Sequence, residues 1–213
     1  MTILTLSVGL LCKTRFAVLR FQSQYSCLPN DQGGIVDDLI IYRIKEEQYL
    51  LVVNASNMQK DWDWISKHHT MGADMKDLSM NYSLLAIQGP KAVEAMQSLT
   101  DVNLSEIKFY NFEVGPFAGI EHVIISATGY TGSGGFEIYC KNEEAKQIWD
   151  KVLEAGADFG IKPIGLAARD TLRLEMGYCL YGNDITDTTS PHEAGLGWVT
   201  KYTKDFINSE NLK

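Results

Sequence analysis

Apolar and polar residues alternate along several short segments of this chain, a pattern typical of half-buried β-strands. Residues 35–44 and 48–54 are two such segments, and the polar break Lys45-Glu46-Glu47 separates them. A short polar break between two such runs predicts an antiparallel hairpin. Three further strands are predicted at residues 84–87, 123–125 and 136–139.

Other segments carry apolar residues three or four positions apart, which is the spacing of one face of an α-helix. Residues 57–69 predict a helix with Asn57 at its N-cap and with Trp62 and Ile65 on its buried face. Three more helices are predicted: one with Pro90 in its first turn, one at residues 144–155 and one at residues 163–177.

The predicted strands and helices mix without a regular strand–helix–strand order and without internal repeats. This organisation predicts an α+β fold of mostly antiparallel sheets flanked by helices. The best candidate for a domain boundary follows the first hairpin and its helix. We therefore expect a first domain at residues 1–78, which contains Asp38, and a second at residues 79–213, which contains Glu137 and Arg169.

The composition of the chain limits its partners. Its 213 residues include 27 acidic and 19 basic side chains, which gives a formal net charge of −8 at pH 7. This charge argues against nucleic acid and membrane surfaces as partners, because both are polyanionic. The apolar run at residues 3–11 is too short to span a bilayer and follows no basic residue, so it predicts a strand or a start-site extension.

The cysteines and histidines show no metal-binding pattern. The four cysteines include no C-x-x-C spacing, and the four histidines include no spacing that suits a metal ion. We therefore expect no bound metal, and reduced thiols in a reducing compartment such as the cytoplasm.

Two adjacent carboxylates, Asp37 and Asp38, interrupt an apolar strand. Neighbouring strand residues point to opposite faces, so one carboxylate is expected to face inward or into a cleft and the other to face solvent. Burial of a carboxylate without partners is costly. The alternative is a pair at the start of the strand with both side chains solvated, and the pattern alone slightly favours it.

A glycine-rich segment, residues 128–135, precedes the strand at residues 136–139. It lacks the lysine of a phosphate-binding P-loop and strands flank it, so it predicts a hairpin turn. Glu137 is the charged residue between Phe136 and Ile138 on this strand. A single carboxylate there is suited to accept two parallel hydrogen bonds from an amino-pyrimidinone edge such as that of a pterin.

Arg169 and Arg173 lie four positions apart on one face of the last predicted helix, near Asp170 and Glu175. One interpretation is an ion-pair network that contributes little to stability. The other is an arginine that reaches a ligand from the start of the helix. Composition alone does not separate the two.

Taken together, the order and spacing of several segments resemble the T protein family, the aminomethyltransferases of the glycine cleavage system. The likeness runs from about Tyr25 to the last residue, Lys213. The segments that carry it are residues 33–40, 52–55, 88–90, 128–132, 165–175 and 180–184, with Ser190-Pro191.

The resemblance implies a folate-binding fold with tetrahydrofolate as co-substrate. Members of the family accept an aminomethyl group from the lipoyl arm of the H protein, release ammonia and form 5,10-methylenetetrahydrofolate. By position, Asp38 matches the carboxylate at the reaction centre, Glu137 the pterin-binding glutamate and Arg169 the arginine beside the ligand. Positions of the cavity wall are matched by Tyr25, Tyr42, Val52, Asn54, Phe109 and Tyr130, of which Phe109 stands where relatives often have tyrosine.

The chain also departs from the family. Residues 1–22 do not resemble the segment that precedes Tyr25 in the family, and nothing matches the family's C-terminal barrel. We therefore expect an incomplete copy with little or no transfer activity, whose exposed apolar faces favour self-association. The resemblance implies the bacterial cytoplasm as its location, with the mitochondrial matrix as the alternative.

Three alternatives to aminomethyl transfer stay open at this point. The first is a folate domain related to dimethylglycine or sarcosine dehydrogenases. The second is the non-enzymatic folate-binding protein of iron–sulfur cluster assembly, whose Lys-Gly-Cys-x-Gly-Gln motif is replaced here by Gly182-Asn183-Asp184. The third is a folded remnant without function.

Overall fold

The computed structural model describes residues 2–4, 21–70, 72–203 and 205–213. The strands are β1 Thr2–Leu4, β2 Ser23–Pro29, β3 Ile35–Lys45, β4 Gln48–Val53, β5 Tyr82–Gln88, β6 Phe112–Phe117, β7 Ile120–Ser126 and β8 Gly135–Lys141. The α-helices are α1 Met58–His68, α2 Ala92–Met96, α3 Asn142–Ala155 and α4 Leu166–Glu175. Short 3₁₀ helices lie at Ala55–Asn57, Gln97–Leu99, Leu104–Glu106, Ala157–Phe159, Gly197–Val199 and Ser209–Leu212.

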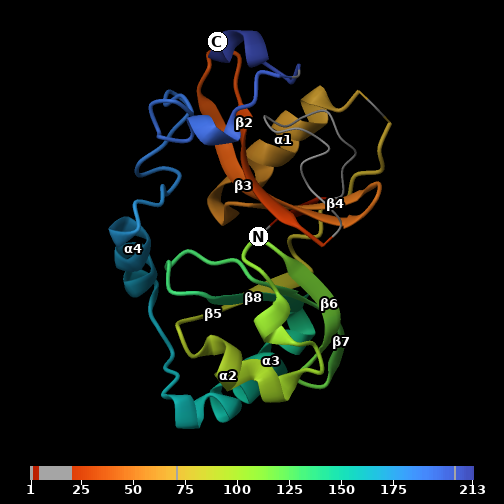
Figure 1. The fold of residues 1–213 in the computed structure, drawn as a ribbon. Helices are drawn as coiled ribbons and strands as arrows, with labels where there is room; N and C mark the ends of the chain where they lie inside the picture. Colours follow the sequence, from red (N-terminus) through yellow and green to blue (C-terminus); the bar gives the residue numbers. More distant parts are fainter. Residues whose placement is uncertain (1, 5–20, 71, 204) are drawn as a thin grey trace. The chain divides into compact units, whose positions relative to one another are not determined.

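These elements form two compact units, which can be followed by colour along the chain in Figure 1. The first unit consists of Met1–Met80 together with Cys179–Lys213, and the second consists of Asn81–Tyr178. The last residues of the chain therefore pack with the first unit, although the sequence places them after the second. The division into a domain at residues 1–78 and a second at residues 79–213 stays a prediction.

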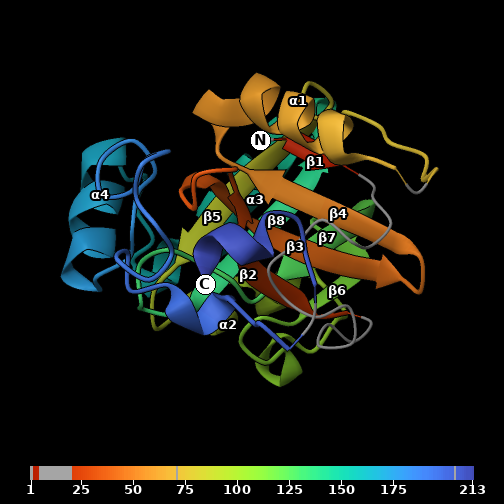
Figure 2. The ribbon, with the colours of Figure 1, turned by 90° about the horizontal axis from the view of Figure 1, so that it is seen from above.

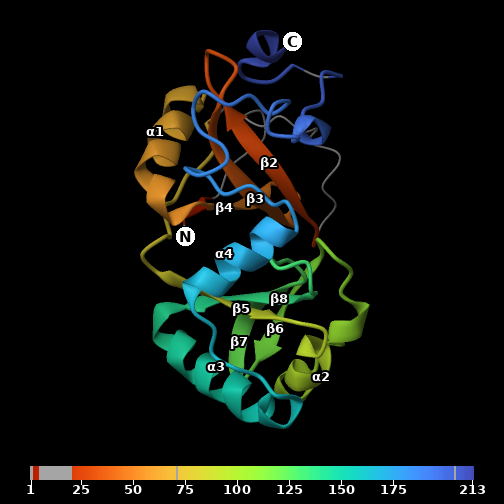
Figure 3. The same cartoon turned by 90° about the vertical axis from the view of Figure 1, so that its left-hand side faces the viewer.

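The first unit contains a four-stranded sheet in the order β1-β4-β3-β2, in which all pairs are antiparallel. Strands β3 and β4 form the predicted hairpin and lie beside β2 in Figure 2. Helix α1 lies against one face of this sheet (Figure 3). Of the apolar run predicted as a strand or extension, residues 3–4 belong to β1, and residues 5–11 lie outside the described part of the chain.

Two clusters of buried apolar side chains cover opposite faces of this sheet. One cluster contains Leu28 of β2 and Ile65 of α1. The other contains Cys27 of β2 and side chains of the segment 185–212. Because Cys27 and Leu28 are neighbours on one strand, their side chains point to opposite faces. The C-terminal segment is thus part of the core of the first unit.

A β-bulge breaks the alternation at the start of β3. The pairing of β2 with β3 shifts beyond Leu28, which leaves Val36 as an extra residue on β3. The resulting register aligns Asp37 with Leu28 and Asp38 with Cys27. Asp37 therefore shares the sheet face that α1 covers, and Asp38 lies on the opposite face.

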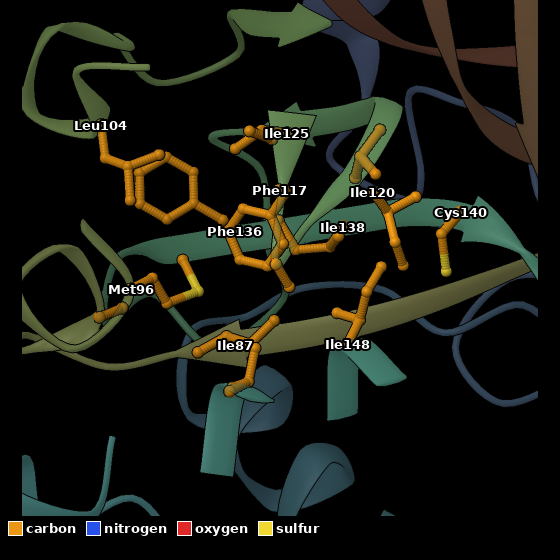
Figure 4. Close-up of a cluster of buried hydrophobic side chains, with 14 of the residues drawn as sticks. Ile87, Met96, Leu104, Phe117, Ile120, Ile125, Phe136, Ile138, Cys140 and Ile148 are labelled. Carbon is orange, nitrogen blue, oxygen red and sulfur yellow. The ribbon is translucent and has the colours of Figure 1, made fainter. Parts of the chain in front are cut away.

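The second unit contains a four-stranded antiparallel sheet in the order β5-β8-β7-β6. Helices α2 and α3 cover one face of it (Figure 3). Between them lies an apolar core, shown in Figure 4, whose fully buried members include Met96, Phe117, Ile125, Ile138 and Ile148. This core fixes the strand that carries Glu137.

The glycine-rich segment connects β7 and β8, which pair as an antiparallel hairpin, so the predicted turn is confirmed. Gly135 is required by its geometry. Its φ is 115°, and a Cβ atom there would lie 2.3 Å from the carbonyl oxygen of Ile87. A side chain at this position would therefore break the β5–β8 pairing next to Glu137.

The predicted α+β fold with antiparallel sheets and flanking helices is confirmed. Two helix boundaries were wrong by a few residues. Helix α2 begins at Ala92 with Lys91 as its N-cap, so Pro90 precedes the helix and does not lie in its first turn. Helix α4 begins at Leu166 after its N-cap Gly165, so Pro163 lies outside it.

Candidate functional site

The buried carboxylate of Asp37 is held by N–H donors from the end of β4 and the start of α1. Its side chain is 0% exposed. It accepts hydrogen bonds from the Asn54 backbone N–H at 3.2 Å, from Asn54 Nδ2 at 2.9 Å and from Asn57 Nδ2 at 2.8 Å. Asn57 occupies the predicted N-cap position of α1, but its side chain serves Asp37 and does not cap the helix.

Asp38 is half-buried on the other face of the sheet. Its Oδ2 accepts a hydrogen bond from the Tyr25 hydroxyl at 2.8 Å, and its Oδ1 accepts one from Asn54 Nδ2 at 2.9 Å. The expectation that the two carboxylates point to opposite faces is correct. The alternative in which both side chains are solvated is wrong, because Asp37 is fully buried and donors from other elements contact both carboxylates.

The surroundings of Asp38 favour its protonated form. Burial, and secondly the nearby charge of Asp37, raise the pKa of Asp38 from 3.8 to about 6, although the hydrogen bonds from Tyr25 and Asn54 act in the opposite direction. A carboxyl group with a pKa near neutrality can accept and return a proton under physiological conditions. Asp38 thus has the properties of a general acid–base group.

Tyr25 is held between Asp38 and an aromatic neighbour. Its ring stacks on Trp198 with the centroids 5.9 Å apart, and its hydroxyl donates to Asp38. The stacking and the hydrogen bond together fix the orientation of the side chain. Burial, followed by the charge of Asp38, raises the pKa of Tyr25. The phenol therefore stays protonated and acts as a hydrogen-bond donor.

In the second unit, the carboxylate of Glu137 has one oxygen engaged. Its Oε2 accepts hydrogen bonds from the hydroxyls of Thr128 and Tyr139. Within the described part of the chain, no donor contacts Oε1. Burial raises the pKa of Glu137, while the Thr128 hydrogen bond and the charge of Arg169 oppose that rise. The residue is a partly buried acceptor with capacity for a further donor.

Arg169 and Arg173 have different surroundings, although they lie one turn apart on the same face of α4. Arg173 is 3% exposed, and its guanidinium donates to Asp170 Oδ1 at 2.8 Å and to the Tyr178 carbonyl at 3.1 Å. Arg169 is exposed, and its guanidinium lies 4.3 Å from the centroid of the Tyr130 ring. The ion-pair interpretation fits Arg173, whereas Arg169 is exposed and its guanidinium lies over an aromatic ring.

Tyr130 is itself stacked on Tyr178, with ring centroids 5.8 Å apart. The Arg169 guanidinium, the Tyr130 ring and the Tyr178 ring therefore form a stack of one cation and two aromatic rings, in the same unit as Glu137. Aromatic faces and a guanidinium suit a flat heterocyclic ligand.

The remaining predicted wall residues differ in exposure. Tyr42 is fully buried, Val52 is half-buried on β4, and Phe109 is 66% exposed. Phe109 makes an edge contact with Tyr110, with centroids 4.7 Å apart. The role of these residues in binding stays a prediction.

Sequence reasoning missed one residue of this site, Asp61. It lies on α1 next to Asp37, and it is as buried as Ile65 one turn later. The signal was present in the sequence, because Asp61 stands four positions before Ile65 on the predicted buried face of that helix.

Neither a candidate metal centre nor a membrane-spanning helix occurs in the described ranges. No group of three or more His, Cys, Asp or Glu side chains there is arranged to hold a metal ion. None of the helices in that part of the chain is long and apolar enough to cross a membrane.

Comparison with known proteins identifies the family. Residues 8–204 match the GCVT N-terminal domain. The chain belongs to this family. The resemblance to the T protein family is thereby confirmed.

This GCVT N-terminal domain is similar in sequence to bacterial aminomethyltransferases. An aminomethyltransferase of Flavobacterium psychrophilum is 70% identical over 192 residues, which are 90% of this chain and 53% of that protein. An aminomethyltransferase of Bacteroides fragilis is 62% identical over 192 residues, which are 89% of this chain and 53% of that protein. The chain thus spans about half the length of the curated relatives it matches.

One solved structure supports the same family assignment. The crystal structure of glycine cleavage system aminomethyltransferase T from Bartonella henselae superposes with a TM-score of 0.87 at 32% identity, covering 99% of this chain and 59% of that one. A heterotetrameric sarcosine oxidase from Corynebacterium sp. U-96 superposes with a TM-score of 0.52 at 16% identity, covering 77% of this chain and 83% of that one. The second likeness is one of fold alone.

Proposed function

We propose that this GCVT N-terminal domain takes part in tetrahydrofolate-dependent aminomethyl transfer from the lipoyl arm of the H protein, the step of glycine cleavage that releases ammonia and forms 5,10-methylenetetrahydrofolate. Its relatives in Flavobacterium psychrophilum and Bacteroides fragilis are named aminomethyltransferases. The observation that carries the proposal is Asp38, a half-buried carboxyl group with two fixed donors and a pKa of about 6.

The proposed reaction is balanced without a covalent bond to the protein. The C–S and C–N bonds of the aminomethyl group break, and two C–N bonds to folate form. Two protons leave the folate nitrogens and end on the lipoyl sulfur and on ammonia. Tetrahydrofolate, when bound, supplies the two nitrogen nucleophiles. The protein contributes mainly proximity and orientation, which can account for several kcal/mol of a barrier.

Asp38 is proposed to hold and move a proton in this reaction. Its ionised form accepts a proton and stabilises positive charge that develops on nearby amines. Tyr25 and Asn54 each donate to one of its oxygens, so the carboxylate keeps one orientation while it does so. These two residues are proposed to position the acid–base group.

Glu137 is proposed to bind the pterin edge of tetrahydrofolate. The fit rests on its Oε1, since Oε2 is engaged by Thr128 and Tyr139 and Oε1 is left for a ligand donor. A pterin presents N–H donors on its amino-pyrimidinone edge, and a charged acceptor makes the stronger hydrogen bonds. Tyr130 and Arg169 provide an aromatic face and a positive charge in the same unit.

The proposed location is the bacterial cytoplasm, because the named relatives are bacterial proteins. The partner that the proposal requires is the lipoylated H protein. Whether this chain associates with itself stays a prediction, which light scattering of the purified chain would test.

The proposed function is tested by the product. The chain is incubated with tetrahydrofolate and with H protein that carries the aminomethyl group on its lipoyl arm. We expect methylenetetrahydrofolate and ammonia in equal amounts, at a low rate, as expected of an incomplete copy, that still exceeds the rate without the chain and depends on both substrates. A preparation that binds tetrahydrofolate but never raises product formation above that background would contradict the transfer function.

Replacement of Glu137 by glutamine tests the pterin site. Glutamine presents an NH₂ group where the carboxylate offers only acceptors, so ligand donors or the Thr128 and Tyr139 hydroxyls lose a partner. We expect Glu137→Gln to weaken tetrahydrofolate binding by about 1–3 kcal/mol, measured by calorimetry. The matched control is Glu121→Gln, since Glu121 is exposed on β7. Equal affinities in the two variants would exclude this role of Glu137.

A further inference from the structure

The side chain of Asp61 is an unexplained carboxyl group inside the first unit. It lies in the first turn of α1 and is 0% exposed. Within the part of the chain that the structure describes, neither of its oxygens receives a hydrogen bond from a donor group. A carboxylate that has lost its water and found no donor is strongly disfavoured, so the geometry requires the neutral acid.

Asp61 lies next to the carboxylate of Asp37, close enough for hydrogen bonding between the two side chains to be one of the causes that raise its pKa. Two carboxyl groups can share a hydrogen bond only if one of them carries a proton. Asp37 already accepts N–H donors from Asn54 and Asn57, which suits an ionised group. Asp61 has none, so the shared proton belongs on Asp61.

The charges around Asp61 support this assignment. Burial, followed by the hydrogen bond to Asp37 and its charge, raises the pKa of Asp61 to about 10, and Asp38 adds to that rise. The positive end of α1 and the neighbouring Lys60 favour the ionised form. The Lys60 ammonium is engaged elsewhere, at 2.7 Å from Asp187 and 2.6 Å from the Tyr181 hydroxyl.

A single amide group connects this pair to the reaction residue. The Nδ2 atom of Asn54 donates to Asp37 Oδ1 and to Asp38 Oδ1, at 2.9 Å in each case. A displacement of Asp37 would therefore move Asn54, and with it one of the two donors that orient Asp38. On the side of α1, Asp37 is contacted by Asn57, which donates to it at 2.8 Å, and neighboured by Asp61.

We propose that Asp61 is a positioning residue, a protonated carboxyl group that donates a hydrogen bond to Asp37 and thereby fixes the Asp37–Asn54 pair that orients Asp38. The proposal rests on the proposed function only in taking Asp38 as the acid–base group. The location of the proton can be measured without any turnover, so failure of the proposed function and failure of this inference are distinguishable.

The test follows the carboxyl carbon of Asp38 by NMR in chain labelled with ¹³C at aspartate, between pH 4 and pH 8. In the unsubstituted chain we expect a midpoint near 6 for Asp38 and no titration of Asp61. Asp61→Asn keeps an N–H donor toward Asp37 and should leave the Asp38 midpoint in place. Asp37→Asn removes the neighbouring charge and should lower that midpoint by about one unit or more.

The reverse pattern would overturn the inference. If the proton lay on Asp37, Asp61→Asn would lower the Asp38 midpoint and Asp37→Asn would not. Titration of Asp61 between pH 4 and pH 8 would overturn it as well.

The positioning role has its own readout in variants that remove the donor. Asp61→Ala should displace the Asp38 midpoint and slow aminomethyl transfer by roughly tenfold, the cost of a misplaced reacting group. Asp61→Asn should recover most of that loss in the same assay. If Asp61→Ala folds and keeps both the midpoint and the rate, Asp61 does not position Asp38. If Asp61→Ala does not fold, the Asp38 midpoints of Asp61→Asn and Asp37→Asn still show which of the two carboxyl groups carries the proton.

Discussion

Replacement of Asp38 by asparagine should slow aminomethyl transfer by roughly 10²–10⁴-fold, the usual contribution of a positioned acid–base group. Asparagine cannot accept a proton, but it keeps one oxygen for the Tyr25 hydroxyl or the Asn54 amide, so the fold should persist. The measurements are the single-turnover rate with aminomethylated H protein and the thermal midpoint of unfolding. The loss should appear in the rate and not in the affinity for tetrahydrofolate.

The pH dependence gives an independent check on the same residue. The reactive form of Asp38 as a proton acceptor is the ionised one, so the rate should rise as the pH increases through its pKa of about 6. Asp38→Asn should remove that rise. Asp31→Asn is the control, because Asp31 is exposed in the turn before β3. Full activity of Asp38→Asn would contradict the acid–base role of Asp38, and a collapse of its thermal midpoint would show that the residue is structural.

Replacement of Gly34 by alanine should destabilise the first unit by about 3 kcal/mol, the upper part of the range for overpacking a core. A Cβ atom at Gly34 would lie 1.7 Å from the carbonyl oxygen of Asp187. That oxygen belongs to the backbone of the C-terminal segment, which is tied to the β2–β3 turn by the Asn30 side chain at 2.7 Å. The segment must therefore move away, and the thermal midpoint should fall by roughly 6–12 °C.

Gly165→Ala is the matched control for this prediction, because nothing lies within 4 Å of a Cβ atom at Gly165. It should leave the thermal midpoint almost unchanged. An unaltered midpoint in Gly34→Ala would mean that the segment 186–190 does not lie on this turn. Calorimetry of both variants under the same conditions measures the two thermal midpoints and tests the prediction.

The sequence predicted best those elements in which the apolar residues are buried and the polar residues are exposed. Strands β3 and β4 alternate clearly, and α1 carries Trp62 and Ile65 on one face. Strand β2 escaped prediction because its buried residues include polar ones, namely Ser23, Gln24 and Ser26. Strand β6 escaped because it contains Gly115 and Pro116, which are tolerated there since β6 lies at the edge of its sheet.

The candidate site was predictable in its residue types but not in its hydrogen bonds. Strand geometry predicted that Asp37 and Asp38 point to opposite faces. Their donors lie on other elements, between 13 and 20 positions away along the chain, and no local pattern signals such a contact. The burial of Asp61 was signalled by its position on the same helix face as Ile65, but its partner was not, because that partner lies on β3.

The division of the chain has a consequence for its synthesis on the ribosome. The second unit is a continuous stretch and can fold as soon as Tyr178 has emerged, whereas the first unit waits for Cys179–Lys213. At the usual speed of translation, the 35 residues from Cys179 to Lys213 delay the first unit by roughly 2–7 s. Until then Cys27 and Ile35 lack the side chains of residues 185–212 that cover them. The nascent chain therefore presents an uncovered apolar strand surface, of the kind that chaperones bind, while its middle part is already folded.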